Sequence, residues 1–256
     1  MKSLCWNCRG LGQPRLAHCL VDMVRSYKPQ LVSLIETKMN EERVERIRRR
    51  LGFTHGLAVD CQGRSGGLAI WWADDVDLTV KSYSMNHIDC IVDLSERIHF
   101  TVFYGNPVTH RRSESWNLLR KLSDNNSLRW LVLGDFNEIL FSWEKVGRRV
   151  RKEWQMQSFR ETVEDCGLMD LGYFGIPYTF SNRQTGQLET RARLDRAFAN
   201  LEWKDQYSRY DVKHLVTSAS DHFALLHTFK NQDIALKESC FASNPCGCAI
   251  KSSVSL

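Results

Sequence analysis

The segment Leu131-Val132-Leu133-Gly134-Asp135-Phe136-Asn137 joins a short apolar run to two polar side chains. The apolar run is typical of a strand buried on both faces, and Gly134 marks its end. Since side chains two positions apart on an extended chain point the same way, Asp135 and Asn137 are predicted to lie together just past the strand. A carboxylate beside a carboxamide suits phosphate ester hydrolysis, because the acid can orient a water or a metal and the amide can donate to a phosphoryl oxygen. These residue types are also common in turns, so the segment indicates a site only if partners occur elsewhere in the chain.

Polar residues end or follow apolar runs at several other points. Asn7 ends the run from residue 4, Glu36 follows residues 31–35, and Tyr104 ends residues 98–104. If these ends converge at one rim of two facing sheets, they form a deep acidic site with one histidine. The full set of such residues is Asn7, Glu36, Tyr104, Asp135, Asn137, Asp195, Asp221 and His222.

The order of apolar runs and amphipathic segments predicts an α/β (α+β) chain in two halves. Two mixed sheets packed face to face, with helices outside, would bury its near-continuous apolar strands. Residues 231–256 lack sustained periodicity and are expected to form a disordered tail after one domain, residues 1–230. Strands are expected at 4–7, 31–35, 68–72, 78–84, 88–94, 98–104, 131–133, 212–216 and 224–229, and helices at 15–24, 41–51, 116–122 and 154–166.

Composition limits the class of protein. A chain of 256 residues, of which 43% are hydrophobic, can bury a sizeable core. No run reaches the roughly 20 apolar residues of a membrane span, and the N-terminus lacks the apolar core of a signal peptide, so we expect an intracellular protein that does not enter a membrane. Nine cysteines without even spacing fit reduced thiols better than a disulfide framework.

The charge pattern favours a polyanionic partner. The formal net charge is +5, and basic clusters occur at residues 48–50, 110–112 and 148–152. Such clusters are often only solvated faces, but they occur here in a chain with candidate phosphate-binding residues.

An ordered set of blocks resembles the endonuclease/exonuclease/phosphatase superfamily, which includes deoxyribonuclease I and apurinic/apyrimidinic endonucleases. The likeness covers roughly residues 1–230, and residues 6–12, 66–68 and 193–197 are most similar to endonuclease domains of plant non-LTR retrotransposons. The blocks are Trp-Asn-Cys-Arg-Gly-Leu (6–11), Leu-Ile-Glu-Thr-Lys (34–38), Tyr-Gly (104–105), Gly-Asp-Phe-Asn (134–137), Tyr-Thr-Phe (178–180), Arg-Leu-Asp-Arg (193–196) and Ser-Asp-His (220–222).

The resemblance implies a deoxyribonuclease I-like four-layer α/β/β/α sandwich and metal-assisted phosphodiester cleavage. Glu36 is expected to bind Mg2+ directly, or Mn2+ in its place, with Asn7 close by. This agrees with the chemistry of Mg2+, which prefers oxygen ligands and needs only one or two carboxylates. Asp195 is expected to hydrogen-bond His222, which then faces the scissile phosphate as a base or an electrostatic stabiliser.

The remaining positions have supporting roles in the same picture. Asp135 is expected to position and activate the attacking water, and Tyr104 to donate to the phosphate. Asn137 and Asn7 are further candidates for phosphate contact, and Thr179 and Ser220 match secondary phosphate-contact positions. Asp221 is expected to assist the metal or to orient His222.

Three functions fit these residues: a magnesium-dependent DNA endonuclease (a nickase), a phosphatase acting on inositol phospholipids or nucleotides, and a catalytically inert nucleic-acid-binding remnant. The basic clusters and the retrotransposon-like sequence blocks favour DNA as the partner. The complete set of acidic and histidine residues argues against the inert remnant. For the endonuclease we expect a monomer located in the nucleus. Loops at 109–115 and 182–190 are the candidates for selecting the DNA target.

Overall fold

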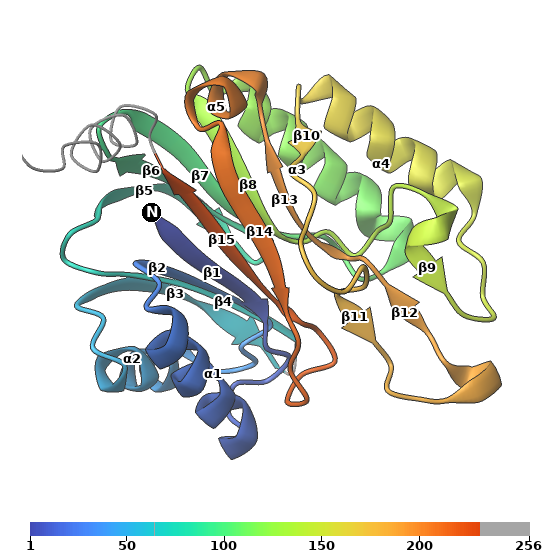
Figure 1. The fold of residues 1–256 in the computed structure, drawn as a ribbon, viewed down its shortest axis with the longest axis horizontal. Helices are drawn as coiled ribbons and strands as arrows, with labels where there is room; N and C mark the ends of the chain where they lie inside the picture. The colour runs from blue at the N-terminus through green and yellow to red at the C-terminus, as the bar shows by residue number, and fades with distance from the viewer. Residues whose placement is uncertain (64, 231–256) are drawn as a thin grey trace, which may run out of the picture.

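The computed structural model describes residues 1–63 and 65–230, so the expected tail at 231–256 lies outside the described residues. Two six-stranded mixed sheets pack face to face, and helices cover their outer faces (Figure 1). This arrangement confirms the predicted four-layer sandwich. Within the described residues, no helix has the length and apolar character needed to cross a membrane.

The first sheet combines the start of the described chain with its end. Its strand order is β14-β15-β1-β2-β4-β3, and β1 and β2 run parallel with Asn7 opposite Ile35. Helices α1 (Pro14–Tyr27) and α2 (Glu41–Arg50) lie on its outer side. The strands are β1 (Lys2–Asn7), β2 (Leu31–Ile35), β3 (His55–Gln62), β4 (Ser65–Trp72), β14 (Arg209–Leu215) and β15 (Ala224–Lys230).

The second sheet has the order β10-β13-β8-β7-β6-β5. Strands β7 and β8 are parallel, with Tyr104 opposite Asp135, and β13 pairs antiparallel with β8 so that Asp195 also lies opposite Asp135. Helices α3 (Arg112–Asp124) and α4 (Glu153–Asp165) cover its outer face. The strands are β5 (Asp77–Ser84), β6 (His87–Asp93), β7 (Arg97–Tyr104), β8 (Arg129–Asp135), β10 (Met169–Asp170) and β13 (Asp195–Ala199).

A third, small sheet extends from the rim of the sandwich. It has the order β11-β12-β9, formed by β11 (Phe180–Ser181), β12 (Arg191–Ala192) and β9 (Lys145–Val146). Phe180 of β11 also forms an isolated bridge with His222. The small sheet therefore begins at His222 and projects away from the two main sheets, as the right-hand side of Figure 1 shows.

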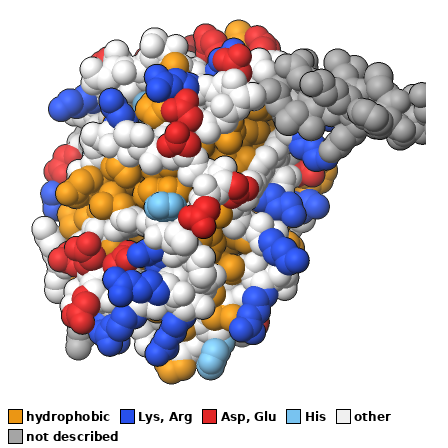
Figure 2. Space-filling model, turned by 90° about the vertical axis from the view of Figure 1, so that its left-hand side faces the viewer, with side chains coloured by type: hydrophobic (Ala, Val, Ile, Leu, Met, Phe, Trp, Pro, Cys, Tyr) orange, Lys and Arg blue, Asp and Glu red, His pale blue; other side chains and the backbone are white. Residues whose placement is uncertain are grey.

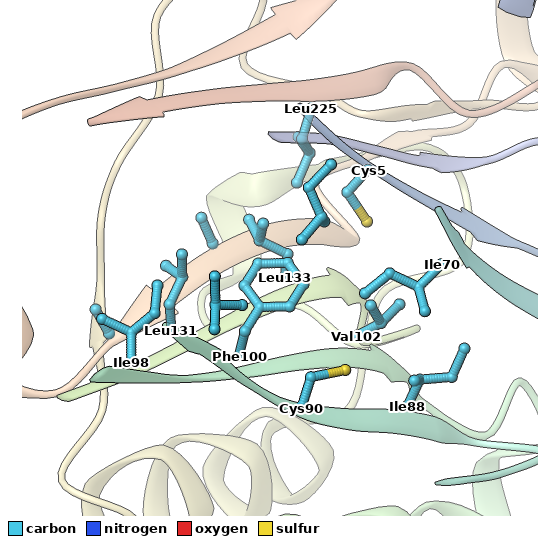
Figure 3. Close-up of a cluster of buried hydrophobic side chains, with 14 of the residues drawn as sticks. Cys5, Ile70, Ile88, Cys90, Ile98, Phe100, Val102, Leu131, Leu133 and Leu225 are labelled. Carbon is cyan, nitrogen blue, oxygen red and sulfur yellow. The ribbon is translucent and has the colours of Figure 1, made fainter. Parts of the chain in front are cut away.

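The core lies between the two main sheets (Figure 3). Leu131 and Leu133 of β8 join Phe100 of β7 there, facing Cys5 and Leu225 of the first sheet. The residues that alternate with them on β8, Trp130 and Val132, pack in a second cluster with α3 and α4 side chains. The apolar run at 131–133 is thus buried on both faces, as its composition predicted.

The edge of the sandwich formed by β3 and β5 is less completely covered than its centre. Partly buried hydrophobic side chains of β3 (Leu57, Val59) and β5 (Val80) pack against the core there. On this side of the molecule, hydrophobic side chains form a band between charged ones (Figure 2). The rim that carries the polar strand ends is a different part of the surface.

Among the described residues, the elements outside the expected strands and helices include β3, β9 to β13, and α5 (Leu201–Gln206). Strand β3 is an edge strand whose mostly exposed or half-buried residues lack a clear apolar alternation. Strand β9 and helix α5 are only two and six residues long, so neither offers enough sequence for a periodic pattern.

Candidate active site

The predicted polar residues meet at the rim where β1, β2, β7 and β8 end. Parallel pairing places Asn7 next to the end of β2, and Tyr104 next to Asp135. Because the two sheets face each other, the two groups come into direct contact across the sandwich. This contact joins residues that are up to 128 positions apart in the chain.

Asn7 connects the two halves of the site. Its Nδ2 donates to Glu36 Oε1 at 3.1 Å and to Asp135 Oδ2 at 2.8 Å. The Tyr104 hydroxyl donates to the same Glu36 oxygen at 3.0 Å. The carboxamide therefore acts as a bridge between two carboxylates, and no free donor of its Nδ2 remains for a phosphate in this arrangement.

His222 and Asp195 form a buried pair on the other side of Asp135. Nδ1 of His222 lies 2.9 Å from Asp195 Oδ2 and 3.8 Å from Asp135 Oδ2. The indole of Trp6 donates to the His222 carbonyl at 3.1 Å, and the Phe180 ring lies 5.1 Å from the imidazole. The backbone contacts, the Nδ1 hydrogen bond and the Phe180 ring fix the orientation of the imidazole, which leaves Nε2 as the nitrogen available to a substrate.

Asp135 and Asn137 form a compact turn after β8. The Asn137 backbone N–H donates to Asp135 Oδ1 at 2.8 Å, and its side-chain Nδ2 donates to the Gly105 carbonyl at 2.9 Å. The predicted closeness of the two side chains is thus present, but it arises from a turn in which Asn137 has a φ of +54°. The straight extended chain assumed from the sequence was wrong at this point.

Thr179 and Ser220 use their hydroxyl groups within the protein. Thr179 Oγ1 accepts from the backbone N–H groups of Leu194 and Asp195, both at 2.9 Å. Ser220 Oγ donates to the Asn7 carbonyl at 3.0 Å and accepts from the His222 backbone N–H. Both hydroxyls hold the catalytic candidates in place, and their predicted contact with phosphate stays a prediction.

Asp221 lies at the exposed margin of the site. Its carboxylate pairs with Arg9 and lies 3.4 Å from Ser220 Oγ. It is oriented toward a basic neighbour rather than toward Glu36, so its expected assistance to a metal is also still a prediction.

Lys38 is a member of the site that sequence reasoning left without a role. Its Nζ lies 3.0 Å from Glu36 Oε2, which gives that carboxylate a third partner besides Asn7 and Tyr104. The sequence signal for it was its position two residues after Glu36. For Arg9, whose partner is 212 positions away, the sequence contains no such signal.

Electrostatics separate the two carboxylates that share Asn7. Burial would raise the pKa of Glu36, but the hydrogen bonds from Asn7, Lys38 and Tyr104 lower it overall, so Glu36 is ionised. Burial, and next the Asp195 carboxylate, raise the pKa of Asp135. Asp135 is therefore suited to accepting a proton near neutral pH.

The same field acts on His222 and Tyr104. Burial alone would lower the pKa of His222, but the carboxylates of Asp195 and Asp135 outweigh it and raise the pKa to about 9. The imidazole is therefore a cation at neutral pH. Burial, followed by Glu36 and Asp135, raises the pKa of Tyr104, so its hydroxyl keeps its proton.

Backbone strain is concentrated at this rim. Arg9, Glu36, Lys38 and Asn137 are non-glycine residues with φ between +48° and +54°. Such left-handed conformations cost about 1–3 kcal/mol each where the side chain is not adapted to them, and they persist where the surroundings hold them in place. Their clustering supports a functional role for the rim.

The donor set fits a divalent cation. Within residues 1–63 and 65–230, one group of acidic and histidine side chains could hold a metal: Asp135, Asp195 and His222, whose ligand atoms lie within 4.8 Å of one another. However, Nδ1 of His222 is already bonded to Asp195 and the ring is a cation, which makes it a poor ligand. Glu36 is ionised and offers oxygen atoms, as Mg2+ requires, so Glu36 is the better centre for the metal.

A basic cleft of about 370 Å³ adjoins the site. It shares Ser220, Asp221 and Lys38 with the rim and is further lined by Arg9, Arg15 and Arg183. The Arg183 guanidinium donates to the carbonyls of Ser218 and Ser220 and so ties the loop at 182–190 to the loop that carries His222. The cleft thus places several cations next to the candidate catalytic residues.

The three basic clusters are less available than the sequence suggested. Arg48 pairs with Glu45 at 2.6 Å, Arg112 pairs with the buried Glu138, and Arg151 reaches the same Glu138 at 2.7 Å. One arginine of each cluster is therefore used inside the protein. In the third cluster, Arg148, Arg149 and Lys152 remain exposed.

Comparison with known families agrees with this geometry. A sequence model described as the endonuclease/exonuclease/phosphatase family matches residues 4–222. The chain belongs to this family. The match runs from the first strand of the sandwich to His222, and it confirms the superfamily inferred from the sequence blocks. No curated protein matched the chain.

Solved structures share the family fold at low sequence identity. A 3'-5' exonuclease, NExo, from Neisseria meningitidis has a TM-score of 0.69 and 18% identity, over 90% of this chain and 100% of that one. An AP endonuclease from Archaeoglobus fulgidus has a TM-score of 0.67 and 17% identity, over 90% and 99%. The endonuclease domain of TRAS1, a telomere-specific non-LTR retrotransposon, has a TM-score of 0.66 and 16% identity, over 90% and 99%. This member of the endonuclease/exonuclease/phosphatase family therefore has the fold of a phosphoesterase hydrolase.

Proposed function

We propose that the protein is a metal-dependent phosphodiesterase that nicks DNA. The observation that carries the proposal is the continuous set of contacts from Tyr104 and Glu36 through Asn7 and Asp135 to His222. These residues come from four strand ends and one loop, and they place an ionised carboxylate, a proton acceptor and a buried imidazolium within one small volume. These are the functional groups needed for attack of water on a phosphate ester.

His222 stabilises charge in this proposal. The Asp195 carboxylate holds Nδ1 and keeps the ring protonated, so Nε2–H is directed at a phosphoryl oxygen as a charge-assisted donor. Negative charge grows on those oxygens as the water attacks, so the interaction is stronger in the transition state than in the ground state. Of the two roles considered for His222, the raised pKa favours the electrostatic stabiliser.

Asp135 takes the proton of the attacking water. Its raised pKa brings it toward the working pH, and the Asn137 and Asn7 contacts fix the direction of its oxygens. Tyr104 keeps its proton and contributes a donor on the Glu36 side. Once substrate displaces the hydrogen bond between Tyr104 and Glu36, the Tyr104 hydroxyl becomes a second donor, besides His222, to a phosphoryl oxygen.

Glu36 would hold the metal, and Asn7, which contacts Glu36, and Asp221 are the residues predicted to support it. When bound, Mg2+, or Mn2+ in its place, would neutralise charge on the phosphate and on the leaving oxygen. The ion pair with Lys38 meanwhile keeps Glu36 ionised.

DNA is the substrate that the surroundings favour. The cleft beside the site carries Arg9, Arg15, Lys38 and Arg183, which suits several successive phosphates better than a single phosphate group. A solved structure of similar fold is described as the 3' phosphatase NExo bound to product DNA hairpin. We further propose a relation to non-LTR retrotransposon endonucleases, a monomeric state and a nuclear location, on the basis of the sequence blocks and the fold shared with TRAS1.

Nicking of supercoiled plasmid tests the proposal. Purified protein is incubated with plasmid in Mg2+ and, in parallel, in EDTA, beside His222→Ala. We expect nicking that requires the metal and falls by about 100-fold or more in the variant, since electrostatic stabilisation of this kind typically contributes that much. The absence of nicking by a folded protein that binds DNA would instead support the inert remnant.

A phosphomonoester assay separates the remaining alternative. Phosphate release from an inositol phospholipid or a nucleotide, without cleavage of plasmid, would support the phosphatase and overturn the endonuclease. The basic cleft gives the reason to expect the opposite result.

A further inference from the structure

Two aromatic rings are stacked on the surface of the turn that follows the Asp135 segment. Phe141 and Trp143 have ring centroids 5.7 Å apart and ring planes only 6° apart. Trp143 is 65% exposed and Phe141 43%, which is unusual for side chains with so much apolar area. The Arg160 guanidinium lies over the Phe141 ring, 5.6 Å from its centroid, so Phe141 contacts both Arg160 and Trp143.

A buried charge network holds this turn rigidly. The Glu144 carboxylate accepts from the backbone N–H of Leu140 at 2.7 Å and from that of Phe141 at 3.2 Å, and it pairs with Arg193 and Arg196. Both arginines also pair with Asp170, at 2.7 and 2.6 Å. Burying four charges is costly for stability, so the network is better explained by the geometry that it fixes than by the energy that it contributes.

The same network ties the aromatic pair to the active site. The Glu144 carbonyl accepts from the Arg193 backbone N–H, two residues before Asp195. Next to it, β9 is the outer strand of the small sheet whose inner strand, β11, bridges to His222. Three strand spacings of about 4.8 Å place Lys145 of β9, two residues after Trp143, roughly 15 Å from His222. This length corresponds to about four base pairs of DNA at a rise of 3.4 Å.

The surroundings of the pair are basic. Residues 145–152 follow it directly and include the exposed Arg148, Arg149 and Lys152. A flat aromatic surface next to flexible cations is complementary to a nucleic acid strand, in which flat bases alternate with phosphates.

We propose that Trp143, backed by Phe141, is a stacking surface for a nucleobase of the DNA about four nucleotides from the cleaved bond. This inference rests on the proposed function, because it assigns the stacking surface to the same substrate. The base would be unpaired or partly unstacked, and Trp143 would contact it in the way that apolar side chains contact opened base steps. Glu144 would act as a positioning residue that holds the rings at a fixed distance from His222.

The test compares two polymers that differ only in their bases. Binding of the wild type and of Trp143→Ala is measured in EDTA, so that no cleavage occurs, to a 16-nucleotide oligothymidylate and to a base-free tetrahydrofuran oligomer of the same length and charge. Stacking on an aromatic side chain is worth about 1–3 kcal/mol per base, which corresponds to roughly 5- to 150-fold in affinity. We expect Trp143→Ala to weaken binding of the oligothymidylate within that range and to leave binding of the base-free oligomer unchanged, while Trp143→Phe retains most of the affinity.

Tyr27→Ala is the matched control. Tyr27 is an exposed aromatic residue at the end of α1, beside Lys2 at the start of β1, whereas the candidate site lies at the other end of β1. This variant should bind both polymers as the wild type does. A folding defect in Trp143→Ala would weaken the binding of both polymers equally, and this result would overturn the proposal. Equal affinity of the variant and the wild type for the oligothymidylate would also overturn it.

The outcome for this inference is separate from that for the proposed function. If Trp143→Ala weakens binding of the oligothymidylate alone but the wild type does not nick plasmid, the stacking surface is supported and the endonuclease function is overturned. A protein that nicks plasmid but binds both polymers equally well before and after the substitution would keep the endonuclease assignment and lose the stacking surface. A wild type that binds neither polymer would overturn the stacking surface directly.

Discussion

His222 Nδ1 lies 2.9 Å from Asp195 Oδ2, although the two residues are 27 positions apart and belong to different segments. Both side chains are buried, so the pair is shielded from water and from salt. The Asp195 backbone N–H is in turn held by Thr179 Oγ1, and the His222 backbone N–H by Ser220 Oγ. The relative position of carboxylate and imidazole is therefore fixed from both sides.

Replacing Asp195 tests the electrostatic role of this pair. Asp195→Asn keeps the shape of the side chain but removes the charge that raises the pKa of His222. We expect the rate of plasmid nicking to fall by about 100-fold or more, because the imidazole would no longer be held as a cation near the phosphate. DNA binding, measured in EDTA, should change little, and a variant that nicks at the wild-type rate would contradict the role assigned to the pair.

Glu36 is tested through the metal requirement. Glu36→Gln removes the ionised carboxylate that the Asn7, Lys38 and Tyr104 contacts maintain, so a higher Mg2+ concentration should be needed for half-maximal nicking. The measurement is the nicking rate as a function of Mg2+ concentration, with addition of EDTA expected to abolish nicking in the wild type. Glu42→Gln is the control, since Glu42 is exposed and pairs with Arg46 on the surface of α2. An unchanged requirement in Glu36→Gln would remove Glu36 as the ligand.

The sequence was a good guide to the strand ends and a poor guide to their contacts. Residues 131–133, and residues 31–35 apart from the buried Ser33, are apolar because both faces of their strands are buried. The strands and the polar residues that follow them could therefore be predicted directly. The sequence could not predict that Asn7 bridges Glu36 and Asp135, because this contact depends on how the two sheets face each other. Arg196 shows the same limit, because its burial in the Glu144 network depends on contacts between segments that are distant in the sequence.

Gly134 is required by close approach of the backbone rather than by chemistry. An added Cβ would overlap the Phe103 carbonyl oxygen of the neighbouring strand β7, and that atom is held in the sheet and cannot move aside. Gly134→Ala should therefore reduce the free energy of unfolding by about 3 kcal/mol, the upper end of the usual cost of overpacking a core. Chemical denaturation measures it, with Gly63→Ala as a comparison at a glycine whose Cβ would meet no neighbour but whose φ is +61°. If Gly134→Ala were as stable as the wild type, this result would contradict the close approach of β7 to β8 at Gly134.

His227 predicts how stability depends on pH. It is fully buried on β15, packs against Trp203 and Phe229, and neither ring nitrogen has a hydrogen-bond partner among the described residues. Burial, and next the N-terminal amino group, lower the pKa of His227 from 6.5 to about 3. The unfolded chain therefore binds a proton below pH 6.5 that the folded protein does not bind, and stability is lost as the pH falls from 6.5 toward 3.

His227→Leu should remove this loss. Keeping the imidazole neutral lowers the free energy of unfolding of the wild type by 1.36 kcal/mol for each pH unit below 6.5, which is about 2 kcal/mol at pH 5 relative to pH 8. Leucine does not titrate, so the variant does not have this loss. We therefore expect the free energy of unfolding of the variant, relative to the wild type, to be higher at pH 5 than at pH 8 by about that amount. Urea denaturation of both proteins at the two pH values measures the difference. An equal difference at pH 5 and pH 8 would mean that His227 is protonated in the folded protein, and that the core around Trp203 admits a charge.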